Sequence, residues 1–200
     1  MAPHTLKDLY IEELRDLYSA ERQILKALPK VIKATEHNDL KEALESHRKQ
    51  TEGHVTRLEE IFEDLGKSAK GKTCHGMEGV LSEGAELIEE EPDAEVLDAG
   101  IISACQRVEH YEIAAYGSVR TWAERLGMDK HAALLAQTLE EEKAADEKLT
   151  ELAAMGINDD AVQDTEVVRE TATADRADRS EKRPAPSRKP ASEKRSRPNA

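Results

Sequence analysis

Aromatic residues are scarce in this chain of 200 residues, where Phe, Trp and Tyr together make up only 3% of the sequence. A β-sandwich or β-barrel normally draws on aromatic and β-branched side chains, so this scarcity argues against either fold. The chain is rich instead in Ala, Leu, Glu, Lys and Arg, and charged residues alone account for 36% of it. These are strong helix formers, and the composition therefore predicts an all-α protein.

Long hydrophobic runs are also missing. No stretch of 18 or more apolar residues occurs, and the first residues lack the basic and then apolar pattern of a signal peptide. We therefore expect a cytoplasmic protein with no membrane partner. The net charge of −13 would repel phosphate backbones, so we expect no nucleic acid partner for the folded part of the chain.

Cysteine is nearly absent, with Cys74 and Cys105 as the two examples. They do not form a CxxC motif, which excludes a zinc ribbon and a disulfide framework. Cys74 lies in a predicted loop beside His75, so we expect it to be exposed and oxidisable. Cys105 lies on an inner helix face and is expected to be an ordinary buried thiol. The sequence also offers no glycine-rich phosphate loop and no Gly-x-Ser-x-Gly nucleophile motif.

The composition changes after Met155 and Gly156. Residues 158–180 are acidic with almost no apolar periodicity, and residues 181–200 contain four prolines and seven Lys or Arg residues. Such a segment cannot bury enough apolar surface to offset the entropy lost on ordering. We therefore predict a folded domain over residues 1–156 and a disordered tail over residues 157–200, acidic at first and then basic and rich in proline.

Apolar residues recur at helical spacing in four segments, over residues 5–34, 39–65, 93–126 and 129–154. Short turns join the first helix to the second and the third to the fourth, which predicts two antiparallel hairpins. Residues 66–92 connect the hairpins and contain a short amphipathic helix over residues 77–88. Two hairpins joined by one long crossover is the connectivity of a ferritin-like four-helix bundle.

Several ionisable residues fall inside the apolar stripes of these helices at about 100° per residue. The first helix contributes Glu13 and Glu21, and the second places His47 and His54 beside Thr51. The third and fourth helices add two residues each, namely Glu109, Glu112, Glu142 and Asp146.

Burying one carboxylate costs several kcal/mol, so a cluster of them requires cations. Few Lys or Arg residues fall on the inner faces, with Arg107 and Arg120 as the main candidates. Glutamate is abundant here, and some copies will point inward by chance. Inward groups on all four helices nevertheless favour a site for two divalent metal ions, and carboxylate oxygens with imidazole suit iron or manganese.

The sequence also resembles a known family in several blocks. These are Leu-Tyr-Ile-Glu-Glu-Leu-Arg-Asp-Leu-Tyr-Ser-Ala-Glu-Arg-Gln at 9–23, Leu-Glu-Ser-His-Arg-Lys-Gln-Thr-Glu at 44–52, Gly-Lys-Thr-Cys at 71–74, Arg-Val-Glu-His-Tyr-Glu-Ile-Ala-Ala-Tyr at 107–116 and Glu-Lys-Ala-Ala-Asp-Glu-Lys-Leu at 142–149. They resemble the YciF/YciE-type stress proteins, a ferritin-like family related to rubrerythrin. The resemblance extends over residues 4–155 and does not include the tail.

This resemblance implies a homodimer of four-helix bundles with a two-metal site and a role in stress. Transferred residue by residue, it assigns Glu21 to the first helix, Glu109 and Glu112 to the third, and Glu142 with Asp146 to the fourth. The second helix departs from the pattern, because Thr51 stands where the family pattern has Glu. The ligand from that helix must therefore be His47, with His54 as the alternative, and Glu13 is an alternative on the first helix.

Three functions remain open at this point. The first is a stress-response protein whose two iron or manganese ions act on dioxygen or peroxide, as an oxidase, peroxidase or ferroxidase. The second is a non-enzymatic stress or assembly module whose core carboxylates no longer bind two metals. Iron storage is the third, and a dimer would argue against it, because storage requires a cage.

Overall fold

Residues 3–162 of the computed structural model are described here, and no β-strand occurs among them. They form five α-helices and one short π-helical turn, and the four predicted long helices are confirmed with ends that shift by one or two residues. The elements are α1 (Leu6–Ala34), α2 (Asn38–Asp64), α3 (His75–Glu89), α4 (Ala94–Arg125), α5 (Asp129–Leu152) and η1 (Ala153–Ile157).

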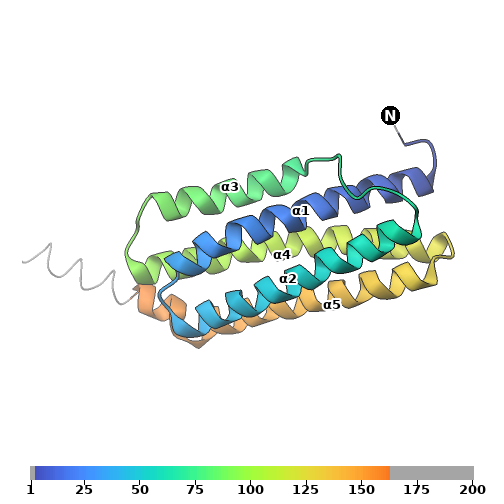
Figure 1. Ribbon diagram of the computed structural model, residues 1–200. Coiled ribbons are helices and arrows are strands. Elements are labelled where there is room, and N and C mark those ends of the chain that lie inside the picture. Colours follow the sequence, from blue (N-terminus) through green and yellow to red (C-terminus); the bar gives the residue numbers. More distant parts are fainter. Residues whose placement is uncertain (1–2, 163–200) are drawn as a thin grey trace, which may run out of the picture. The chain divides into compact units, whose positions relative to one another are not determined.

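The four long helices pack as a bundle in which α1 and α5 each contact both α2 and α4 (Figure 1). Helices α2 and α4 therefore lie at opposite corners of the bundle. The crossover returns along the length of the bundle through α3, so that α2 and α4 run in the same direction (Figure 1). Helix α3 packs on the outside against α1 and α4. This is the predicted ferritin-like arrangement of two hairpins and one long crossover.

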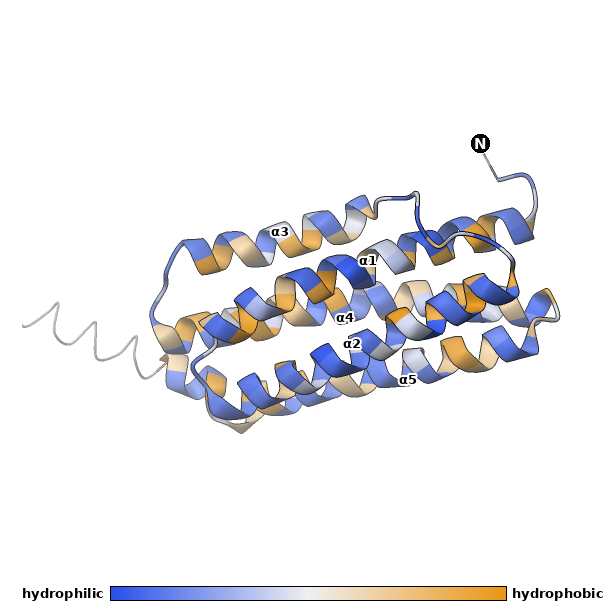
Figure 2. Cartoon of the chain, in the orientation of Figure 1, coloured by the Kyte–Doolittle hydropathy of each residue, from blue (hydrophilic) through white to orange (hydrophobic). Residues whose placement is uncertain are grey.

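Two hydrophobic clusters divide the interior along the bundle axis. One contains Leu14 and Leu17 of α1 with Leu58 of α2 and Leu135 of α5. The other contains Ile24 and Leu28 of α1 with partners from α2, α4 and α5, including Leu44, Ile102 and Leu149. Each long helix therefore carries apolar residues on both sides of a short polar interval, and Figure 2 shows hydrophilic and hydrophobic residues mixed along every helix.

The start of α3 corrects one expectation about cysteine. Cys74 is fully buried, whereas the sequence suggested an exposed thiol. Its sulfur accepts a hydrogen bond from the backbone N–H of Met77 and lies 3.0 Å from the hydroxyl of Tyr111. The residue acts as the N-cap of α3, because a side chain that satisfies the first free N–H groups stabilises a helix start. A loop position in the sequence thus becomes a buried anchor for the crossover helix.

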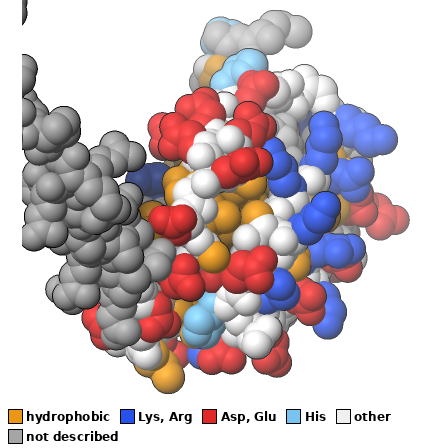
Figure 3. All heavy atoms as spheres, turned by 90° about the vertical axis from the view of Figure 1, so that its left-hand side faces the viewer, with side chains coloured by type: hydrophobic (Ala, Val, Ile, Leu, Met, Phe, Trp, Pro, Cys, Tyr) orange, Lys and Arg blue, Asp and Glu red, His pale blue; other side chains and the backbone are white. Residues whose placement is uncertain are grey.

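The end of the bundle extends slightly beyond the predicted boundary at residue 156. Gly156 has φ of 143°, which allows the chain to turn, and Ile157 is buried in the second hydrophobic cluster. Helical backbone continues to residue 162, so residues 157–162 of the predicted tail are helical, and the rest of that tail, residues 163–200, lies outside the described residues. Figure 3 views this end of the bundle and shows hydrophobic side chains surrounded by acidic and basic ones. None of the helices in the described range is long and apolar enough to span a membrane.

Candidate metal centre

A layer of buried ionisable side chains separates the two hydrophobic clusters. Each long helix supplies at least one member, and the exposed fraction of every member is 7% or less. The layer consists of Glu21 from α1, His47 and His54 from α2, Glu109 and Glu112 from α4, and Glu142 from α5. Carboxylates and imidazoles rarely occupy a core in such number unless they are paired or bind a metal.

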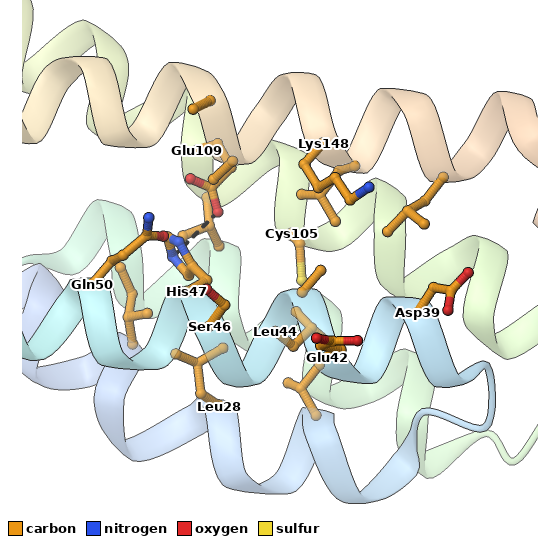
Figure 4. Close-up of a pocket in the computed structure, with 18 of the residues that line it drawn as sticks. Leu28, Asp39, Glu42, Leu44, Ser46, His47, Gln50, Cys105, Glu109 and Lys148 are labelled. Atoms are coloured by element: carbon orange, nitrogen blue, oxygen red, sulfur yellow. Dashed lines mark ion pairs between the residues drawn. The ribbon is translucent and has the colours of Figure 1, made fainter.

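Four of these side chains form the first group. One ligand atom from each of His47, Glu109, Glu112 and Glu142 lies within 4.8 Å of the corresponding atoms of the other three. Nε2 of His47 is 3.4 Å from Oε1 of Glu109, and both residues line a pocket that opens at the surface (Figure 4). Glu109 and Glu112 are one helical turn apart on α4, which places both carboxylates on the same face of that helix.

The second group shares one residue with the first. Glu21, His54 and Glu142 bring one ligand atom each within 4.8 Å of one another. Nδ1 of His54 lies 2.9 Å from Oε1 of Glu142 and 3.4 Å from Oε1 of Glu21. The hydroxyl of Tyr116 donates a hydrogen bond to Oε1 of Glu21, which leaves Oε2 of Glu21 as the free oxygen. Glu142 therefore belongs to both groups and joins them into one centre.

The orientation of His54 is fixed from outside this centre. Its Nε2 lies 3.0 Å from Oε2 of Glu141, so its Nδ1 faces Glu21 and Glu142. Arg57 holds Glu141 in turn through two hydrogen bonds of 2.8 Å, one to each carboxylate oxygen. The same guanidinium donates a third hydrogen bond to the hydroxyl of Thr138. A carboxylate that binds the far nitrogen of a histidine is the usual means of orienting that histidine toward a metal.

The proton affinities in this layer are strongly altered by burial. Burial raises the pKa of Glu109 and of Glu112 well above the usual range, and the neighbouring carboxylate of Glu142 raises both further. Burial also raises the pKa of Glu21, and His54 only partly offsets this effect. Burial alone would lower the pKa of His54, but Glu142 and Glu21 outweigh it and raise the value to about 10. The raised pKa of His54 therefore arises from its contacts with Glu142 and Glu21.

Several buried polar atoms of the layer make no hydrogen bond, and they indicate whether the layer could hold metal ions. Eight of its buried polar atoms make no hydrogen bond: Oε2 of Glu21 and Glu109, both carboxylate oxygens of Glu112 and Glu142, and Nδ1 of His47 and His54. Of these, Nδ1 of His54 and Oε1 of Glu142 still form the ion pair of 2.9 Å. Leaving a buried charged oxygen unsatisfied costs at least about 1–3 kcal/mol. Four carboxylates carry four negative charges, which two divalent cations would neutralise with both imidazoles uncharged. The residues present therefore fit two ions, and their mixture of oxygen and nitrogen donors suits iron or manganese.

Three positions singled out from the sequence do not join the centre. Asp146 is partly exposed and lies 3.3 Å from Nε2 of His110, while its other oxygen accepts a hydrogen bond from Gln106. Glu13 is 39% exposed and faces Lys72. Thr51 is buried between the two histidines, but its hydroxyl donates to the carbonyl of His47.

The sequence left His47 and His54 as alternative ligands from the second helix. The structure places both histidines in the layer, each in a different group of potential ligands. The cation that sequence reasoning missed is Arg57, since neither predicted inward arginine reaches the layer. Arg107 pairs with Glu83 near the surface, and Arg120 pairs with Glu124. Glu141 was missed as well, because it lies about 100° around the helix from Glu142 and its arginine partner is 84 residues away.

Comparison with known proteins agrees with this architecture. YciF of Escherichia coli (strain K12) is 45% identical over 155 residues, which are 77% of this chain and 93% of that protein. The crystal structure of the E. coli stress protein YciF matches with a TM-score of 0.75 and 44% identity, covering 78% of this chain and 99% of that chain. YcfI of Rhodopseudomonas palustris matches with a TM-score of 0.72 and 44% identity, covering 74% of this chain and 94% of that chain. The profile of a domain of unknown function, DUF892, matches residues 5–162, and the chain therefore belongs to this family as a YciF-type protein.

Proposed function

We propose that this chain is a stress-response protein that holds two iron or manganese ions in the core of its bundle and reduces peroxide or dioxygen with them. The observation that carries the proposal is the position of Glu142, which belongs to both groups of potential ligands. His47, Glu109 and Glu112 would complete the first ion's site, and Glu21 and His54 the second. When bound, two such ions supply the two electrons that the reduction of a peroxide requires. The stress role follows the description of the E. coli relative as a stress protein.

The protein's own residues have distinct tasks in this proposal. Glu142 is shared, so it would hold the two ions close together. Tyr116 donates a hydrogen bond to Oε1 of Glu21, and Oε2, which makes no hydrogen bond, would be available to a metal. Arg57 and Glu141 hold the ring of His54 so that Nδ1 faces inward. The two hydrophobic clusters above and below the layer limit the access of water along the bundle axis, which strengthens electrostatic interactions within the layer.

Peroxide consumption by protein loaded with ferrous iron tests this function. Under anaerobic conditions we expect one hydrogen peroxide to be consumed for every two ferrous ions, with uptake of two protons and formation of two water molecules and two ferric ions. The variant Glu109→Ala/Glu142→Ala removes two carboxylates from the first group and one from the second, and it should abolish rapid consumption. Glu140→Ala/Glu147→Ala is the matched control, because both of these α5 residues are exposed.

Two results would contradict the proposal. The first is equal peroxide consumption by the Glu109→Ala/Glu142→Ala variant and the wild-type protein. The second is a stress phenotype that this variant rescues fully, which would favour the non-enzymatic stress or assembly module. Helical circular dichroism and thermal melting establish, for both experiments, that the double variant is folded.

A further inference from the structure

A cavity of about 520 Å³ leads from the surface to the first group of the centre (Figure 4). Its exposed rim lies between α2 and α5 and includes Asp39, Ser46 and Lys148. Its inner wall includes His47 and Glu109, and Figure 4 shows these two side chains directed toward each other. The metal layer is therefore accessible from one side of the bundle, through this cavity.

The wall of the cavity is mainly apolar. All four bundle helices contribute aliphatic side chains, among them Leu28 of α1, Leu44 of α2, Val108 of α4 and Leu149 of α5. Pockets of roughly 300–1,000 Å³ with apolar walls and a few convergent polar groups are typical of small-molecule sites. The convergent polar groups here are His47 and Glu109, and Oε2 of Glu109 is buried without a hydrogen-bond partner.

The cavity is long in the direction of the bundle axis. Its lining residues extend from Asp39 to Gln50 on α2 and from Ala144 on α5 to Met155 in η1. The eleven residue steps on α2 correspond to about 16 Å at 1.5 Å per residue. The two helices are antiparallel, so Gln50 and Ala144 mark the end near the metal layer, and Asp39 and Met155 mark the far end. This shape suits one extended aliphatic chain better than a compact ring.

A second apolar cavity of about 400 Å³ adjoins the first beneath α3. Both cavities are lined by Ala27, Val31, Leu81, Cys105 and Val108. Cys105 is half-buried at this junction, one helical turn before Glu109. Its thiol therefore reports on the occupancy of either cavity.

We propose that these cavities bind a molecule with a single aliphatic chain whose uncharged polar end, a hydroxyl or hydroperoxide, lies against His47 and Glu109. This inference rests on the proposed function, because it names the class of substrate that would reach the metal layer. An uncharged end is required because the carboxyl of Glu109 occupies the inner end, whereas Lys148, the lysine of the lining, lies at the exposed rim. Burying an anionic end there without a partner would oppose binding.

Binding to the full chain after removal of metal by a chelator tests the inference without using the activity of the loaded protein. We expect calorimetry to detect saturable binding of decanol. Butanol should bind at least ~100-fold more weakly, since each methylene group that leaves water changes the Kd roughly fourfold. Decanoate should bind ~10-fold more weakly or worse than decanol, because its charge must be buried.

One variant and a matched control locate the site. Ala145 lines the larger cavity, and Ala145→Trp should fill it and weaken decanol binding ~10-fold or more, as expected when a snug apolar site loses its volume. Ala136→Trp is the control, because Ala136 lies on the same helix with similar partial exposure and does not line either cavity. Helical circular dichroism must show that both variants are folded.

The wild-type chain offers a second measurement, which keeps the inference testable if Ala145→Trp does not fold. Saturating decanol should slow the alkylation of Cys105 several-fold, whereas butanol at the same concentration should not. An unchanged alkylation rate, or equal affinity for decanol and butanol, would overturn the inference. It would also be overturned if decanol did not bind and Ala145→Trp converted a dimer into a monomer, because the groove would then be an interface between two copies.

These outcomes are separable from the two-metal proposal. The absence of decanol binding removes the substrate class and leaves the metal site intact. If the chain binds decanol and takes up no metal, the two-metal proposal fails and the cavity remains a binding site for an aliphatic molecule.

Discussion

Nε2 of His54 and Oε2 of Glu141 lie 3.0 Å apart. The positions of the two residues on their helices do not predict this contact. The contact turns Nδ1 of the imidazole toward Glu142, at 2.9 Å. Because Arg57 holds both oxygens of Glu141, the orientation of a buried candidate ligand depends on an ion pair nearer the surface.

Glu141→Ala should therefore weaken metal binding about 10- to 100-fold, the usual effect of removing a carboxylate that orients a ligating histidine. Competition with a chromophoric chelator measures this affinity. Glu140→Ala is the control, because Glu140 is exposed and pairs with Lys143 at the surface of α5. Equal affinities for iron in the two variants would show that the Glu141 contact does not orient His54 for metal binding.

All six members of the layer lie within an apolar stripe in the sequence, with His54 as the alternative to His47 on the second helix. Angular position alone misplaced Asp146, which lies only about 40° around the helix from Glu142 but about 6 Å farther along it. At that level Asp146 meets Gln106 and His110 instead. The periodicity of the sequence predicts which face of a helix a residue lies on. Whether the residue joins the layer also depends on its position along the bundle axis relative to residues of the other three helices.

The side-chain pairs that join different helices of the bundle could not be predicted from the sequence. Arg57 and Glu141 lie beside the stripe, and their ion pair joins helices that are far apart in the chain. Cys74 followed a run of loop-forming residues, so its burial against Tyr111 depended on the packing of the crossover. Pairings of this kind arise only when the complete bundle assembles.

Glu112→Gln should stabilise the metal-free protein and impair metal binding. Both oxygens of Glu112 are buried without a partner, so the charged form destabilises the fold by about 1–3 kcal/mol. The pKa of Glu112 is raised in the folded state, so the stability of the wild type falls as the pH rises above 4.5 through that raised value. Urea unfolding in the presence of a chelator should show a difference in unfolding free energy that grows from about pH 5 to pH 8.

The exposed substitution Glu140→Gln controls for charge removal from the surface. If Glu112→Gln were no more stable than the wild type at either pH, the carboxyl of Glu112 would not be under electrostatic strain in the metal-free protein.

Tyr116→Phe should weaken the second ion's site selectively. The substitution removes the hydrogen bond to Glu21 and leaves the first group intact. One such bond corresponds to about threefold to tenfold in affinity. Stepwise iron titration should then show one ion bound as tightly as in the wild type and the other more weakly. Tyr10→Phe, which alters a contact with His131 at the far end of the bundle, should change neither step.

The two cysteines should differ in reactivity. Cys74 is fully buried, and we expect it to be alkylated only after unfolding. Burial raises the pKa of Cys105 to about 12, so its alkylation should accelerate roughly tenfold per pH unit between about pH 8 and pH 10 without a plateau. Peptide mapping by mass spectrometry distinguishes the two sites. Modification of Cys74 in the native protein at the rate found in urea would contradict its burial.

The most direct test of the account is an anomalous-scattering map of crystals grown from protein loaded anaerobically with iron. Two peaks are predicted, one beside His47, Glu109 and Glu112 and the other beside Glu21 and His54, with Glu142 in contact with both. A map without anomalous density in this layer, from protein that retains no iron after loading, would contradict the two-metal centre and the function built on it.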